Sequence, residues 1–167
     1  MRLMLLLLPV ALGFSGCAYK LGPTNGRAAG SHSIQVQPFV NKTIEPRLED
    51  ALTQALRKQL QQDGTFRLET AGPGDVIVSG HIVRFVRQHL SFQARDVLTP
   101  KDYRLVMTAR ITAQERVGGK VLLDRTVSGH STIRVGSDLV SAERQAIPLL
   151  AEDLARNATA LLVDGSW

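Results

Sequence analysis

Residues 103–122 read YRLVMTARITAQERVGGKVL, and the order of apolar and polar residues in this stretch decides the fold. From Tyr103 to Gln114 the two kinds alternate with a period of two, which is typical of an antiparallel strand with one buried face and one solvent face. Gly118-Gly119 fits a two-residue hairpin turn, so residues 120–135 are expected to return as the partner strand. The buried face would hold Tyr103, Leu105, Met107, Ala109, Ile111 and Ala113, and the solvent face would hold Arg104, Val106, Thr108, Arg110, Thr112 and Gln114.

The residues before this hairpin predict a strand and then a helix. Residues 34–40 alternate apolar and polar side chains, and Pro38 confines this strand to a sheet edge or to the end of its pairing. A helix is expected from Pro46, in the first turn, to Gly64, which supplies the stop. Its buried stripe would consist of Leu48, Ala51, Leu52, Ala55, Leu56 and Leu60.

The helix is followed by a short strand at 65–69 and a long strand at 76–89. Because a helix joins residues 34–40 to residues 76–89, these two strands are expected to run parallel in one sheet. Residues 90–101 have mixed polarity and include Pro100, so they are predicted to form a loop, with a strand over residues 90–94 as the alternative.

The end of the chain predicts a second amphipathic helix. It would begin after Ser141 as N-cap, and Pro148 would either kink it or start a new helix. Its apolar stripe would consist of Ile147, Leu150, Ala151, Leu154, Ala158, Leu161 and Leu162.

These elements predict an α+β fold in two layers. Two amphipathic helices would pack on one face of a mixed four-stranded sheet, in the order β-α-β-β-β-α. The other face of the sheet would remain open to solvent.

The N-terminus predicts secretion and a lipid anchor. Arg2 precedes an apolar run of about a dozen residues, too short to span a bilayer. Small residues then lead to Cys17, so residues 1–16 are interpreted as a lipoprotein signal peptide and Cys17 as the lipidated residue. An acidic residue directly after the lipidated cysteine tends to keep a Gram-negative lipoprotein in the inner membrane. Ala18 is not acidic, so the outer membrane is expected. Residues 17–33 are rich in glycine and small polar residues and predict a flexible tether, and residues 34–167 predict a single domain.

Composition limits the chemistry of the domain. Cys17 is the only cysteine, and His32, His81, His89 and His130 are scattered, so neither a disulfide nor a metal site is expected. No nucleophile elbow, phosphate loop or dinucleotide fingerprint is present, so we expect no catalysis and no cofactor. Lys and Arg number 20 against 15 Asp and Glu, which favours an anionic partner. Secretion excludes nucleic acid and leaves anionic lipids, lipopolysaccharide or an acidic protein surface.

The chain also resembles a known family, the lipopolysaccharide-assembly lipoproteins called LptE. The resemblance rests on the lipobox, on the order and spacing of the predicted elements, and on four stretches: residues 16–19 (GCAY), residues 34–49, residues 118–122 (GGKVL) and residues 150–155 (LAEDLA). It implies an outer-membrane lipoprotein facing the periplasm, without catalysis. Such a protein plugs a large β-barrel, LptD, and the pair inserts lipopolysaccharide into the outer leaflet.

Arginines are the candidate ligand residues, because a planar guanidinium can bind two oxygens of a phosphate or carboxylate. Arg104 and Arg110 share the predicted solvent face of one strand, and Arg84, Arg87, Arg95 and Arg134 are further candidates. Basic residues on a strand surface also serve simply for solvation and for protection of sheet edges. The alternative function is a periplasm-facing lipid carrier or envelope-binding lipoprotein that acts without a barrel.

Overall fold

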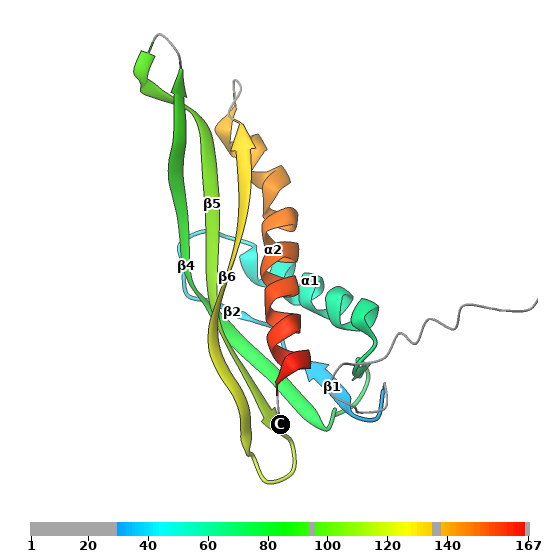
Figure 1. Ribbon diagram of the computed structural model, residues 1–167. Coiled ribbons are helices and arrows are strands. Elements are labelled where there is room, and N and C mark those ends of the chain that lie inside the picture. The colour runs from blue at the N-terminus through cyan, green and yellow to red at the C-terminus, as the bar shows by residue number, and fades with distance from the viewer. Residues whose placement is uncertain (1–29, 94–95, 135–137, 166–167) are drawn as a thin grey trace, which may run out of the picture.

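The computed structural model describes residues 30–93, 96–134 and 138–165. The signal peptide, Cys17 and most of the tether lie outside these residues. The eight elements are β1 (Ser33–Val36), β2 (Val40–Asn41), α1 (Leu48–Asp63), β3 (Arg67–Leu68), β4 (Val76–Gln93), β5 (Asp96–Glu115), β6 (Val121–Arg134) and α2 (Leu139–Asp164), as Figure 1 shows.

The sheet confirms the predicted α+β class but has six strands instead of four. Its order is β3-β1-β4-β5-β6, with β2 also paired to β4. The additional strands arise because the predicted strand 34–40 is split into β1 and β2, and because β3 pairs with β1. Pro38 lies at the split, where it can donate no hydrogen bond to a neighbouring strand. The predicted parallel pairing holds, since β1 and β4 run parallel.

The loop predicted for residues 90–101 is wrong where the structure describes it, and the strand alternative holds as far as Gln93, because β4 and β5 form one long antiparallel hairpin. Backbone pairing extends to Phe92 with Pro100 and Gln93 with Asp96. The register shifts three times between His89 and Gln93. Each shift interrupts the alternation of side chains, so the sequence no longer shows a period of two there.

The second hairpin is confirmed, with a longer turn than predicted. Gly118 and Gly119 both have positive φ, at 89° and 67°. The Glu115 N–H donates to the Lys120 carbonyl, so four residues, not two, lie inside the closing hydrogen bond.

The helix ends differ from the prediction mainly at their starts. α1 begins at Leu48, two residues after Pro46, and Gly64 ends it in the left-handed region as predicted. α2 begins after Asp138 instead of Ser141, because the Asp138 carboxylate accepts from the Val140 and Ser141 N–H groups. It then continues past Pro148 as a single helix.

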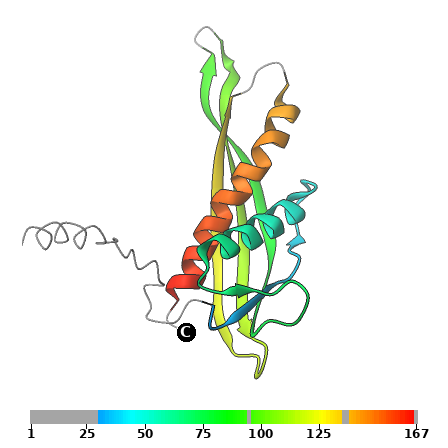
Figure 2. The same ribbon diagram turned by 90° about the vertical axis from the view of Figure 1, so that its right-hand side faces the viewer.

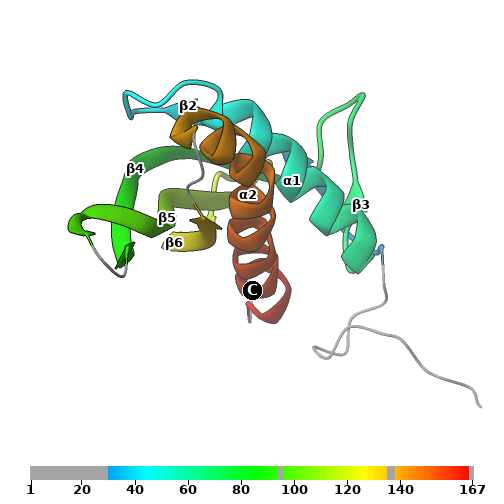
Figure 3. The same cartoon turned by 90° about the horizontal axis from the view of Figure 1, so that it is seen from above.

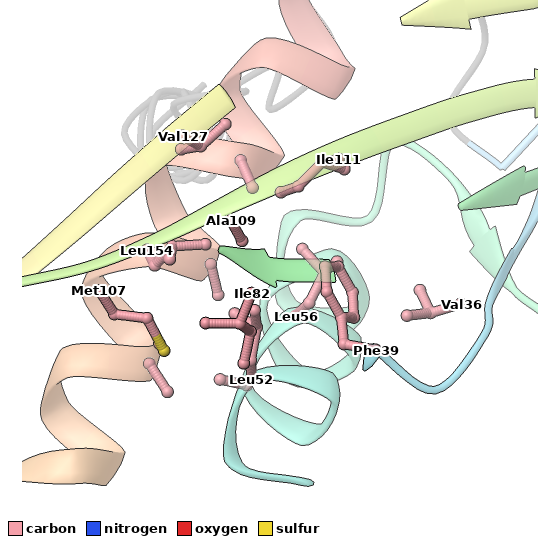
Figure 4. Close-up of a cluster of buried hydrophobic side chains, with 14 of the residues drawn as sticks. Val36, Phe39, Leu52, Leu56, Ile82, Met107, Ala109, Ile111, Val127 and Leu154 are labelled. Carbon is pink, nitrogen blue, oxygen red and sulfur yellow. The ribbon is translucent and has the colours of Figure 1, made fainter. Parts of the chain in front are cut away.

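Both helices cover the same face of the sheet (Figure 2). The leucines of α1 are buried together with alternate residues of β4 and β5 and with the apolar stripe of α2. Figure 4 shows Leu52 and Leu56 of α1, Ile82 of β4, Met107 of β5 and Leu154 of α2 in this core. The two layers are therefore in direct apolar contact.

Candidate functional site: the open face of the sheet

Neither helix covers the other side of β4, β5 and β6, which we call the open face (Figure 3). Buried and accessible residues alternate along β5, and the strand register extends this alternation to β4 and β6. The open face includes Ser79, His81, Arg84, Val86, Gln88, Arg104, Val106, Thr108, Arg110, Thr112, Asp124, Thr126, Ser128, His130 and Thr132, together with the pair Asp102 and Arg134.

Arg110 lies on the open face but is already paired. Its Nε and one terminal nitrogen donate to the two carboxylate oxygens of Asp124 on β6, at 2.7 and 2.6 Å. The hydrogen bond from Arg110 holds the pKa of the Asp124 carboxyl below its usual range, and the same bond raises the pKa of Arg110. A ligand anion would have to compete with this carboxylate.

Arg134 is paired in a similar way. It faces Asp102 across β5 and β6 and donates to its carboxylate at 3.0 Å. The Ser91 hydroxyl donates to the other oxygen of Asp102, and this bond is the main cause that lowers the pKa of that carboxyl.

Arg84 and Arg104 are the two unpaired arginines of the open face. Both are exposed, and neither forms an ion pair within the described residues. Arg84 is in register with Thr108, four residues along β5 from Arg104, so about 14 Å of strand separates them. The hydroxyls of Thr108 and Ser128 lie 2.9 Å apart in the row of Arg84. This part of the face therefore offers two free cations and several hydroxyls.

Arg87 does not belong to the open face. It is in register with the buried Leu105 and forms ion pairs with Glu143 of α2 and with Glu45, before α1. Glu143 is only 7% exposed, and its hydrogen bond is the main cause that raises the pKa of Arg87. Arg87 therefore joins β4 to α2 and to the segment before α1, and its charge is not free for a ligand.

The remaining sequence candidates, Cys17 and Arg95, lie outside the described residues. In the part of the chain that the structure describes, no cluster of His, Cys, Asp and Glu could hold a metal ion. The same part contains no helix that is both long and apolar enough to cross a membrane.

Sequence reasoning missed the acidic partners, namely Glu45, Asp102, Asp124 and Glu143. Each is separated in the chain from its arginine, and only the strand register and the helix packing bring the two together. Nothing in the local pattern distinguishes a paired arginine from a free one.

A mixed sheet with two helices on one face and a mostly polar, partly basic open face defines a small two-layer α+β domain. Residues 31–161 match the family model described as LptE, lipopolysaccharide-assembly, and the chain belongs to that family. The family consists of non-catalytic assembly lipoproteins of the bacterial envelope. No curated protein matches the chain.

Solved structures share the fold at low sequence identity. A protein from Xanthomonas campestris has a TM-score of 0.64 at 10% identity, covering 86% of this chain and 90% of its own. A hypothetical protein from Chlamydia trachomatis has a TM-score of 0.58 at 12% identity, covering 83% and 98%. A minor lipoprotein from Acinetobacter baumannii has a TM-score of 0.52 at 14% identity, covering 79% and 92%. At these identities the likeness shows the fold alone.

Proposed function

We propose that the protein is an outer-membrane lipoprotein, anchored through Cys17 and facing the periplasm. It forms a complex with an LptD-type β-barrel as its plug and assists insertion of lipopolysaccharide into the outer leaflet. The observation that carries this proposal is the family match over residues 31–161. The lipobox at residues 14–17 and the glycine-rich residues that follow support the anchor and the tether.

The shape and polarity of the domain support the role of a plug. The lumen of a large β-barrel is polar. The open face is mostly polar, apart from the pair Val86 and Val106, and the outer sides of α1 and α2 carry charged residues such as Lys58 and Glu152, which pair across the two helices at 2.8 Å. Most of the surface of the domain can therefore face a polar wall.

The free arginines provide the contact with lipopolysaccharide. Its phosphates and carboxylates attract a guanidinium that has no acidic partner of its own, so Arg84 and Arg104 are the primary ligand residues of the open face. Arg110 and Arg134 are secondary, because a ligand must first displace Asp124 or Asp102. Neighbouring hydroxyls on Thr108, Ser128 and Thr132 can donate further hydrogen bonds to the same oxygens.

The barrel partnership is tested by gentle detergent extraction of outer membranes that contain a tagged copy of the full chain. Mass spectrometry of the purified material should recover a large β-barrel in about equal amount. A second tagged outer-membrane lipoprotein of unrelated fold, with the same kind of anchor, is the control. Recovery of the chain alone, under conditions that keep other barrel complexes intact, would overturn the plug role and favour a free carrier.

A further inference from the structure

A cleft opens on the helix side of the molecule, away from the open face. It lies between the segment that leads into α1 and the first two turns of α2, which are neighbours in Figure 3. Its volume is about 380 Å³. The lining consists of Glu45, Pro46, Arg47, Val140, Glu143, Arg144 and Ile147.

The cleft combines two free cations with apolar walls. Arg47 and Arg144 are exposed, and within the described residues neither forms an ion pair. The two carboxylates in the lining, Glu45 and Glu143, are both bound by Arg87. Arg47 and Arg144 are thus the groups available to a ligand, and Val140 and Ile147 extend one side of the cleft along α2.

The surroundings of the cleft hold its walls in place. Arg87 binds Glu45 on one wall and Glu143 on the other, so the cleft is formed before any ligand arrives. Ile44, next to this wall, is fully exposed, and Val140 on the opposite wall is 60% exposed. Exposed apolar side chains beside free cations suit a ligand that is itself both anionic and apolar.

Arg47 has an unusual backbone. Its φ of 66° and ψ of 12° place it in the left-handed region, and it is the only non-glycine residue with positive φ among the described residues. Glycine would adopt this conformation without strain. The position therefore keeps an arginine at the mouth of the cleft although glycine would suit the backbone better, which favours a functional reason for the guanidinium.

We propose that this cleft binds the phosphate head group of a lipid. Arg47 and Arg144 bind the phosphate oxygens, and the first part of the acyl chains lies along Pro46, Val140 and Ile147. The proposal does not depend on the barrel partnership, because it rests only on the residues that line the cleft. It gives the protein a second lipid contact besides its own anchor.

The test uses the full lipidated chain in nanodiscs of phosphatidylcholine, titrated with dihexanoyl phosphatidic acid below its micelle concentration. Calorimetry should show saturable binding, and dihexanoyl phosphatidylcholine should not bind. Arg47→Gly and Arg144→Gln should each weaken binding about ten-fold or more, because each removes a charged partner of the phosphate. The matched control is Arg67→Gln, the same loss of charge at an exposed arginine on β3, and it should leave binding unchanged.

Arg47→Gly also separates binding from folding. Because glycine relieves the left-handed strain, this variant should melt at the same temperature as the parent or higher, while its binding falls. The proposal is overturned if no saturable binding occurs, if Arg67→Gln weakens binding as much, or if both cleft variants bind like the parent. Binding of inorganic phosphate alone with equal affinity would overturn the lipid as the ligand and leave only a phosphate site.

Discussion

At the scale of single residues, the environments of Arg84 and Arg87 are set by a bulge in β4. The register with β5 shifts between Ile82 and Arg84, so Val83 is the extra residue of the strand. Strict alternation from the buried Ile82 would turn Arg84 toward the helices and Arg87 toward solvent. The register shift reverses both orientations. It places the unpaired Arg84 on the open face and Arg87 beside Glu143.

We expect Arg87→Gln to lower the free energy of unfolding by about 1–3 kcal/mol, because it leaves the buried Glu143 carboxylate without its partner. The partial exposure of Arg87 keeps this value below that of a fully buried pair. Denaturant unfolding of the full chain in detergent measures the change. Arg84→Gln, three residues away on the same strand, is the matched control and should change stability by less than about 0.5 kcal/mol. Equal effects of the two variants would show that the ion pairs of Arg87 with Glu45 and Glu143 add no stability.

A second prediction at this scale concerns Asp75, which joins the start of β4 to β1. The Ser33 N–H and hydroxyl both donate to its carboxylate, at 2.9 and 2.7 Å, and these bonds hold its pKa below the usual range. A lowered folded-state pKa stabilises the fold above the unfolded-state pKa of about 3.9. That contribution is lost as the pH falls through the folded-state pKa.

Asp75→Asn should therefore be less stable than the parent at pH 6, and the difference should shrink as the pH is lowered from about 5 to 3. Thermal melts across this range measure it. Ser33→Ala should show the same convergence, because it removes one of the two donors from the carboxylate. A difference that stays constant with pH would mean that the charge of Asp75 is not the cause.

At the scale of elements, the sequence predicts a strand or helix correctly wherever its apolar residues recur with a regular period. The alternation of residues 103–114 appears in β5 without a break up to the turn, and the leucine stripe of α1 is buried as predicted. The end of the β4–β5 hairpin beyond His89 is predicted as a loop, with a strand only as the alternative, because its bulges destroy the period on which the prediction rests. The ion pairs were missed for a different reason, since they depend on register between strands and not on local pattern.

The packing of α2 on β6 depends on Gly129, which has a helix backbone against it. A Cβ at Gly129 would lie 2.5 Å from the Leu154 backbone nitrogen. We expect Gly129→Ala to destabilise the fold by about 1–3 kcal/mol, because the helix must move away from the strand. Gly72→Ala is the control, since its nearest heavy atom would lie 3.9 Å away. Denaturant midpoints of the two variants should therefore differ clearly, and similar midpoints would show that α2 can shift without cost.

At the scale of the whole molecule, the free positive charge is divided between the two layers. The two candidate sites each have two free arginines, Arg84 and Arg104 on the sheet side and Arg47 and Arg144 on the helix side, while Arg87, Arg110 and Arg134 are used in ion pairs. The two sites can therefore be altered separately. A substitution on the open face should not disturb the cleft, because the core separates the two faces.

The last prediction is a charge reversal of the open face, Arg84→Glu together with Arg104→Glu. The amount of lipopolysaccharide that co-purifies with the full chain should fall about ten-fold or more, since each change replaces an attraction to phosphate by a repulsion. Stability should change by less than about 0.5 kcal/mol per site, because both side chains are exposed and unpaired within the described residues. The control is Arg67→Glu with Arg125→Glu, the same change of net charge at exposed arginines off the open face. If the control loses as much lipopolysaccharide, the interaction depends on overall charge and the open face is not the ligand surface. If the double variant keeps both its lipopolysaccharide and its β-barrel partner, the barrel and not the open face binds the lipopolysaccharide.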